Sequence, residues 1–295
     1  MPRGAVVALT RTALGLAAWL LAVPVAGGTY LGSYTWVPPF RDAGGYSALW
    51  LAPDGPGFVT LSDRGAWIRG TLARDTDGVV AGITVTARGT LAPEAGRRPR
   101  DKYGRDAESI AVVGGAVYVA YEGRSRIMRF DDLDGVPVPL PVPSAFRTFD
   151  GNAGIEALAA DADAEGRLYA IPEASGDLRR PFPVFRFADG AWSVPFTLPR
   201  RGGFLVSGAA VGPDGRLYVL EREFALIGFR TRIRSLTLEG RDERTEFESA
   251  LGQHDNLEGI DVWRDATGRL RVTMISDDNQ RPRFQRTEFV DYLLD

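Results

Sequence analysis

One pattern recurs five times along the chain, at intervals of about 50 residues. Each copy has a polar residue, an apolar stretch, a turn rich in aspartate and glycine, a second apolar stretch and then a carboxylate. Turns such as VGG and PDG contain residues that tolerate a positive φ, which favours tight β-hairpins. The copies span residues 46–65, 107–124, 155–174, 206–223 and 257–278.

A repeat of this length, built on a two-stranded hairpin, is typical of a β-propeller blade. Alternating apolar stretches between the hairpins supply outer strands, and no long segment after the N-terminus keeps an apolar period of 3.6. We therefore predict an all-β protein, a β-propeller with five visible blades. A sixth blade could lie in the long first interval or in residues 28–36. A large β-sandwich is the alternative, although it would not need a regular repeat.

The N-terminus has the layout of a secretory leader. Arg3 and Arg11 accompany an apolar run at 13–26, which small residues follow. This run is short for a membrane span, although an uncleaved anchor is the alternative. We expect residues 1–27 to be a signal peptide and residues 28–295 to form one propeller domain. The mature protein would be periplasmic or secreted, with no membrane association after cleavage.

Composition excludes several classes of site and partner. The chain of 295 residues has no cysteine, which excludes disulfides and thiolate metal sites. Its net charge is −3, and no stripe of arginines and aromatic residues is present, so we expect no nucleic-acid partner. The sequence leaves the oligomeric state open.

Propeller geometry predicts where the polar ends of each repeat lie. The first strand of a blade lines the central channel and the hairpin returns to the same face, so equivalent residues should form a ring at one mouth of the channel. The closing residue is acidic in all five repeats and the leading residue in three. The pairs are Ser47 with Asp63, Glu108 with Glu122, Glu156 with Glu173, Ser207 with Glu221, and Glu258 with Asp277.

Up to eight carboxylates would converge there, and burying them without compensation is costly. Calcium prefers such oxygen ligands, so we predict Ca²⁺ as a cofactor. The predicted metal ligands are Asp63, Glu108, Glu122, Glu173, Glu221 and Asp277. Neutral ligands could come from Asn152, Asn256 and Asn279. The flanking arginines Arg64, Arg105, Arg124 and Arg222 could also neutralise the negative charge of these carboxylates, and they could bind an anionic substrate. The alternative is that these acids are solvated turn residues.

Eight short motifs occur in the order seen in one family of exported bacterial proteins. They are GYSAL, LSDRG, DAESIAV, YEG, NAGIEALA, LERE, NLEGIDV and ISDDN, within about residues 29–292. The chain thus resembles the phytase-like family, whose members carry the description "esterase-like activity of phytase". The resemblance implies a β-propeller and suggests phosphoester hydrolysis that depends on a metal.

Several standard catalytic motifs are missing from the sequence. There is no G-x-S-x-G nucleophile elbow, no P-loop and no dinucleotide-binding glycine fingerprint. The single histidine, His254, excludes any multi-histidine metal site and would have to serve any Ser-His-Asp triad.

Metal-assisted hydrolysis of a small anionic phosphoester or ester is the remaining hypothesis. Glu156 or Glu258 would act as general base, and Arg64 and Arg222 would neutralise developing charge. The alternative is a non-enzymatic periplasmic propeller that binds a ligand or a protein and holds a structural calcium.

Overall fold

The computed structural model describes residues 27–40, 43–94, 104–149, 154–164, 166–281 and 284–294. The predicted leader therefore lies outside the described residues, except for Gly27. Twenty strands and the short 3-10 helix η3 (Ser144–Thr148) make up its regular structure. None of the described residues forms a helix with the length and apolar character needed to cross a membrane.

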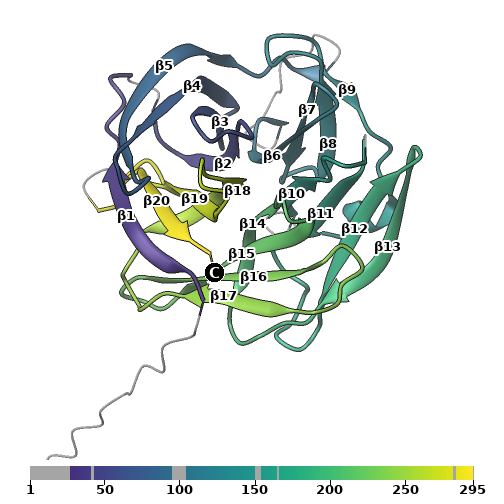
Figure 1. Cartoon of the computed structure of the whole chain (residues 1–295). Coiled ribbons are helices and arrows are strands. Elements are labelled where there is room, and N and C mark those ends of the chain that lie inside the picture. Colours follow the sequence, from purple (N-terminus) through teal and green to yellow (C-terminus); the bar gives the residue numbers. More distant parts are fainter. Residues whose placement is uncertain are drawn as a thin grey trace, which may run out of the picture.

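Five four-stranded antiparallel sheets stand around a central axis, which makes the protein a five-bladed β-propeller (Figure 1). Blade 1 contains β2 (Tyr46–Leu51), β3 (Gly57–Ser62), β4 (Ala66–Arg74) and β5 (Val80–Thr90). Blade 2 contains β6 (Ala107–Val113), β7 (Ala116–Tyr121), β8 (Arg126–Phe130) and β9 (Val138–Pro139). Blade 3 contains β10 (Ile155–Ala160), β11 (Leu168–Pro172), β12 (Phe182–Ala188) and β13 (Ala191–Leu198). Blade 4 contains β14 (Leu205–Val211), β15 (Arg216–Phe224), β16 (Phe229–Thr237) and β17 (Arg244–Glu248).

Blade 5 joins the two ends of the chain. It contains β18 (Asn256–Arg264), β19 (Leu270–Asp277), β20 (Glu288–Leu293) and, as its outermost strand, β1 (Thr29–Thr35). Figure 1 shows β1 lying beside β20. Residues 28–36 therefore complete the fifth blade, and the suggestion of a sixth blade is wrong. The long first interval is taken up by the long strands β4 and β5 and by the connection that follows Thr90.

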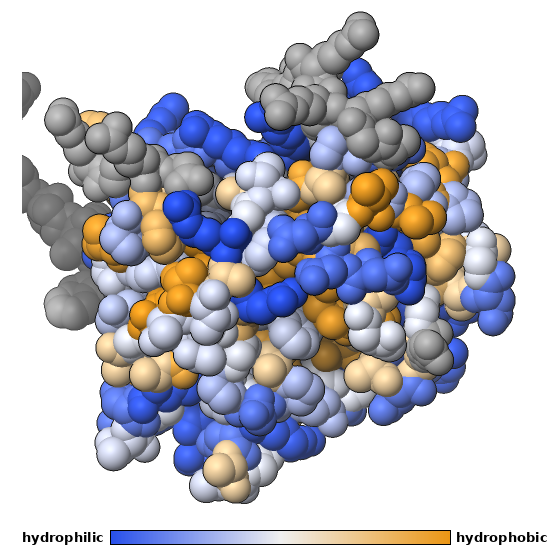
Figure 2. Space-filling model, turned by 90° about the horizontal axis from the view of Figure 1, so that it is seen from above, coloured by the Kyte–Doolittle hydropathy of each residue, from blue (hydrophilic) through white to orange (hydrophobic). Residues whose placement is uncertain are grey.

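The core is divided among the five contacts between neighbouring blades. Each contact has its own cluster of buried apolar side chains, such as Leu61, Val119 and Phe130 between blades 1 and 2. The innermost strands are almost fully buried because they pack against blades on both sides, whereas most of β5 alternates between half-buried and exposed residues. At the surface, Figure 2 shows hydrophilic residues interspersed with apolar ones on the edge of the disc that it presents.

A buried ion pair fastens blade 5 to blade 1. Arg74 Nη1 lies 2.6 Å from Asp291 Oδ1, and both side chains are largely buried. Asp291 also accepts hydrogen bonds from Thr273 Oγ1 at 2.6 Å and from the amide of Val80 at 2.9 Å. These contacts lie next to the β1–β20 pairing that closes the ring.

We expect Asp291→Asn to destabilise the protein by about 3–5 kcal/mol, because it leaves the Arg74 guanidinium buried without its partner. Urea unfolding would measure the loss. The control is Asp242→Asn, which removes a half-exposed carboxylate from its pairs with Arg216 and Arg244 and should cost much less, because solvent screens such pairs. Equal, small losses for both variants would show that the buried pair does not hold the ring closed.

A candidate site at the mouth of the channel

The same β-bulge interrupts the innermost hairpin of every blade. In each case the register shifts by one residue near the start of the first strand. A bulge leaves one residue out of the ladder and re-aims its side chain. The five extra residues are the leading residues of the sequence repeats, namely Ser47, Glu108, Glu156, Ser207 and Glu258.

The register also identifies the closing position of each repeat. In each hairpin, the residue before the bulge pairs with a residue near the end of the second strand. The closing position is the next residue along that second strand. For example, Ala107 pairs with Tyr121, so Glu122 occupies this position in blade 2. The five equivalent residues are Asp63, Glu122, Glu173, Arg222 and Asp277.

The prediction that Glu221 belongs to this ring is wrong. Val206 pairs with Glu221, so the closing position of blade 4 is Arg222. Glu221 points to the other side of its strand and is fully buried. Its Oε2 accepts hydrogen bonds from Arg232 Nε and Arg234 Nε, each at 2.8 Å, and Arg234 Nη2 bonds to its Oε1. Glu221 is therefore part of a structural ion cluster within blade 4.

Two groups of three carboxylates meet at the mouth. The first is Asp106, Glu108 and Glu122, and the second is Glu122, Glu156 and Glu173. Within each group, one oxygen from every residue lies within 4.8 Å of the others, and Glu122 belongs to both. Asp106 is a member that the sequence analysis missed. It lies in the motif DAESIAV, two residues before Glu108, and that spacing was the available signal.

Arg222 lies between the second group and blade 5. Its Nη2 is 3.2 Å from Glu173 Oε1, and its Nη1 donates to Asn256 Oδ1 at 2.7 Å and to Glu258 Oε1. Asn256 Nδ2 donates to the same Glu258 oxygen at 2.8 Å. Burial opposes the charged form of Arg222, but Glu258, Glu156 and Glu173 outweigh it and raise its pKa.

The remaining predicted residues lie around this centre. Asp63 accepts a hydrogen bond from Gln280 Nε2 at 3.4 Å, and Arg64, the next residue, is exposed. Asp277 Oδ1 accepts from the amide of Asn279 at 2.7 Å. Arg105 and Arg124 are exposed near the mouth, and Asn152 lies outside the described residues.

The leading serines hold neighbouring blades together. Ser47 Oγ donates to the carbonyl of Ala107 at 2.6 Å, and Ser207 Oγ donates to that of Leu257 at 3.0 Å. His254 is buried, with its Nε2 2.7 Å from the hydroxyl of Tyr292. These partners give the two serines and the histidine structural roles.

We call the eight acids at the mouth the carboxylate ring. They are Asp63, Asp106, Glu108, Glu122, Glu156, Glu173, Glu258 and Asp277. Burial and repulsion between neighbouring acids raise the pKa of Asp63 to about 6, of Glu122 to about 7 and of Asp277 to about 8. The same causes, burial first, hold the pKa of Glu108 and of Glu156 well above the usual range. The ring therefore favours protons or another cation.

These shifts predict how stability depends on pH. The unfolded acids have pKa values of about 3.8–4.5, so above pH 5 the folded protein binds more protons than the unfolded chain. Stability without calcium should then fall as pH rises to 8. His254, whose pKa burial lowers to about 4, acts in the opposite direction only below pH 6.5. The fall should therefore be clearest between pH 6.5 and 8.

Thermal unfolding in EDTA and in calcium at these two pH values would test this prediction. Calcium should raise the melting temperature more at pH 8, because its binding displaces protons from the ring. A melting temperature in EDTA that stays constant or rises between pH 6.5 and 8 would contradict it.

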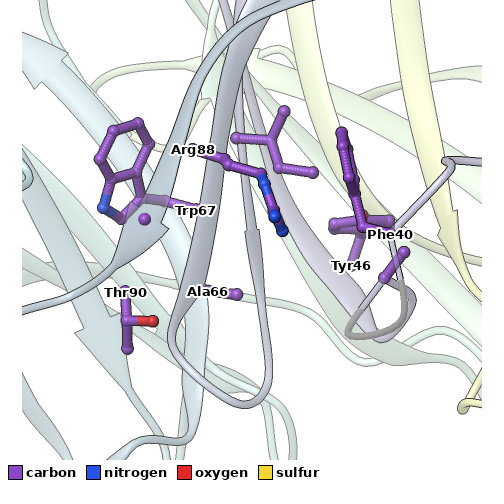
Figure 3. Close-up of a pocket in the computed structure, with 9 residues that line it drawn as sticks. Phe40, Tyr46, Ala66, Trp67, Arg88 and Thr90 are labelled. Atoms are coloured by element: carbon purple, nitrogen blue, oxygen red, sulfur yellow. The ribbon is translucent and has the colours of Figure 1, made fainter.

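A small pocket of about 200 Å³ lies on blade 1. Its lining includes Phe40, Tyr46, Ile68 and Arg88, and the Arg88 guanidinium lies 4.3 Å from the centre of the Phe40 ring (Figure 3). None of the eight ring acids lines it. We therefore place the candidate site at the mouth of the channel.

Comparison with known proteins identifies a family. The model of the family described as "Phytase-like: Esterase-like activity of phytase" matches residues 41–280. No curated protein matches the chain significantly. Among solved structures, the PQQ-bound aldose sugar dehydrogenase of Streptomyces coelicolor is 12% identical, with a TM-score of 0.48 over 92% of this chain and 100% of that one. The α-L-arabinofuranosidase PaAbf62A of Podospora anserina is 11% identical, with a TM-score of 0.47 over 92% and 97%.

Proposed function

Because the chain belongs to the phytase-like family, we propose that it hydrolyses small anionic phosphoesters or related esters at the carboxylate ring, with the help of calcium. The observation that carries the proposal is the pair of carboxylate groups that share Glu122, next to the buried cation of Arg222. The family description, which names both phytase and esterase-like activity, supports this class of reaction.

The residues present fit a hard divalent cation. All the donors are carboxylate oxygens, which calcium prefers, and one buried guanidinium cannot balance eight acids. Asp106, Glu108 and Glu122 would hold one ion, and Glu122, Glu156 and Glu173 a second. A bound ion of this kind lowers the pKa of a coordinated water and polarises a phosphoryl oxygen.

The protein's own residues would bind and orient the substrate. Arg222 would hold the anionic group, since its guanidinium is fixed by Glu173, Glu258 and Asn256. Arg64, exposed beside Asp63, would add a second positive charge at the entrance. Of the two candidate bases, we assign the role to Glu258, because it lies outside both groups of three, whereas Glu156 belongs to the second.

Hydrolysis assays test the proposal directly. The purified protein would be given p-nitrophenyl phosphate, bis-p-nitrophenyl phosphate and p-nitrophenyl acetate, with calcium and with EDTA. We expect turnover of at least one phosphoester in calcium and its loss in EDTA. No turnover under any condition would overturn the proposal and favour a binding propeller with a structural calcium.

We expect Arg222→Gln to separate binding of the cation from binding of the substrate. The change removes a positive charge that competes with calcium for Glu173 and Glu258, so calcium affinity should stay the same or increase. By contrast, kcat/KM for a phosphoester should fall by about 10²–10³-fold, as when one charge-stabilising donor is removed. Calorimetry and kinetics would measure the two effects. The control is Arg269→Gln, in the exposed turn before β19. Equal kinetics for the two variants would contradict the role of Arg222.

A further inference from the structure

The connections between the second and third strands of the blades form a rim just outside the carboxylate ring. Four of them begin at or next to the closing residue of their blade, and the connection of blade 4 begins three residues after Arg222. The connections are 63–65, 122–125, 173–181, 225–228 and 278–287, the last without its residues 282 and 283 in the described structure. What this rim exposes determines what can approach the mouth.

One connection carries an apolar tip. The pairing of β15 and β16 continues beyond Arg222 as far as Phe224 and Phe229, about 7 Å farther along the strand. Phe224 is 63% exposed, and Leu226 and Ile227 in the turn are 93% and 86% exposed. Phe284, on the connection of blade 5, is 87% exposed. Three large apolar side chains within four residues at a protruding tip are costly in water unless they have a partner.

The other four connections carry exposed positive charge. The exposed arginines are Arg64, Arg124, Arg179, Arg180, Arg281 and Arg286. The turns on the opposite face of the disc carry mainly exposed acids, with aspartates at 54, 77, 132, 163, 189 and 214 beside the exposed Arg241 and Arg269. Among the described residues, exposed arginines thus outnumber exposed acids, such as Asp177, on the rim connections, and these arginines lie beside an apolar tip.

We propose that the mouth face docks on an anionic lipid surface, with Phe224, Leu226 and Ile227 inserted at the level of the headgroups and the rim arginines on lipid phosphates. A narrow convex tip suits a soft lipid interface, and apolar burial together with basic residues gives binding to anionic lipid. This proposal departs from the expectation that the mature chain has no membrane association. It does not depend on the hydrolase activity.

Vesicle sedimentation tests the proposal. The chain without residues 1–26 keeps all twenty strands and removes the apolar leader from the measurement. It would be mixed, in calcium-containing buffer, with vesicles of phosphatidylglycerol and phosphatidylcholine or of phosphatidylcholine alone. We expect binding to the anionic vesicles that weakens with salt. Absence of binding to them would overturn the proposal.

Paired variants locate the contact. Leu226→Ser with Ile227→Ser should lower the fraction bound by about tenfold or more, because it removes the inserted apolar groups. Arg179→Gln with Arg180→Gln should weaken binding several-fold and reduce its salt dependence. Val136→Ser with Val138→Ser, also exposed but outside the rim, should leave binding unchanged. Equal binding by the tip variant, or its conversion from an oligomer to a monomer in gel filtration, would overturn the proposal, the latter in favour of contact between copies of the chain.

Discussion

Replacing Glu122 with glutamine should reduce calcium affinity and hydrolysis more than any other single change in the carboxylate ring. Glu122 is the one acid that belongs to both groups of three, so its loss removes a charged ligand from two places at once. Ligand charge tunes calcium affinity over orders of magnitude, and we expect a loss of about 100-fold. We expect kcat/KM for a phosphoester to fall by at least a similar factor.

Calorimetric titration with calcium, together with kinetics at saturating calcium, would measure both effects. Removal of a half-buried charge from a crowded acidic site should also stabilise the calcium-free protein at pH 8, because it relieves the cost of burial and the repulsion with Asp106 and Glu173. The matched control is Glu239→Gln, an exposed glutamate in the turn between β16 and β17. If Glu122→Gln titrates like the control, calcium does not bind at the ring.

The repeat predicted the blades because each hairpin is a local structure with its own turn signal. Gly115 and Gly215 adopt a φ of 75° in two of these turns, where a side chain is unfavourable. The strand β1, which completes blade 5 and closes the circle of blades, has no such signal. β1 pairs with β20 at the other end of the sequence, and no local pattern encodes a contact over that separation. Residues 28–36 could therefore be mistaken for part of another blade.

The site was predictable to within one residue in blade 4. The motif LERE places Glu221, Arg222 and Glu223 in succession, and neighbouring residues on a strand face opposite sides. Only the register with β14, set by the bulge after Val206, decides that Arg222 faces the mouth. Because the closing residue is acidic in the other four repeats, the sequence favoured Glu221 at the closing position of blade 4. The structure places Arg222, a cation, there instead. Asp106 was missed because it precedes its strand and has no acidic equivalent in the other repeats.

This one-residue difference makes Glu221→Gln the sharpest test of the register. The Glu221 side chain is fully buried. It pairs with Arg232 and Arg234, whose side chains are 9% and 1% exposed. Removing its charge leaves two buried guanidinium groups with weaker partners. Arg232 keeps only Glu248, at 3.8 Å, and Arg234 keeps Glu243, which is partly exposed. We expect a loss of about 3–5 kcal/mol, and a fall in melting temperature of about 10 °C.

Calcium affinity of the folded Glu221→Gln protein should be unchanged, because Glu221 lies on the side of β15 that faces away from Arg222 and the ring. Glu173→Gln should do the opposite, weakening calcium binding with little loss of stability, because Glu173 is a member of the second group of three. Melting curves with calcium and with EDTA would compare the two variants. If Glu221→Gln lost its response to calcium and kept its stability, the side chain would belong at the mouth after all, and the register that excludes it would be wrong.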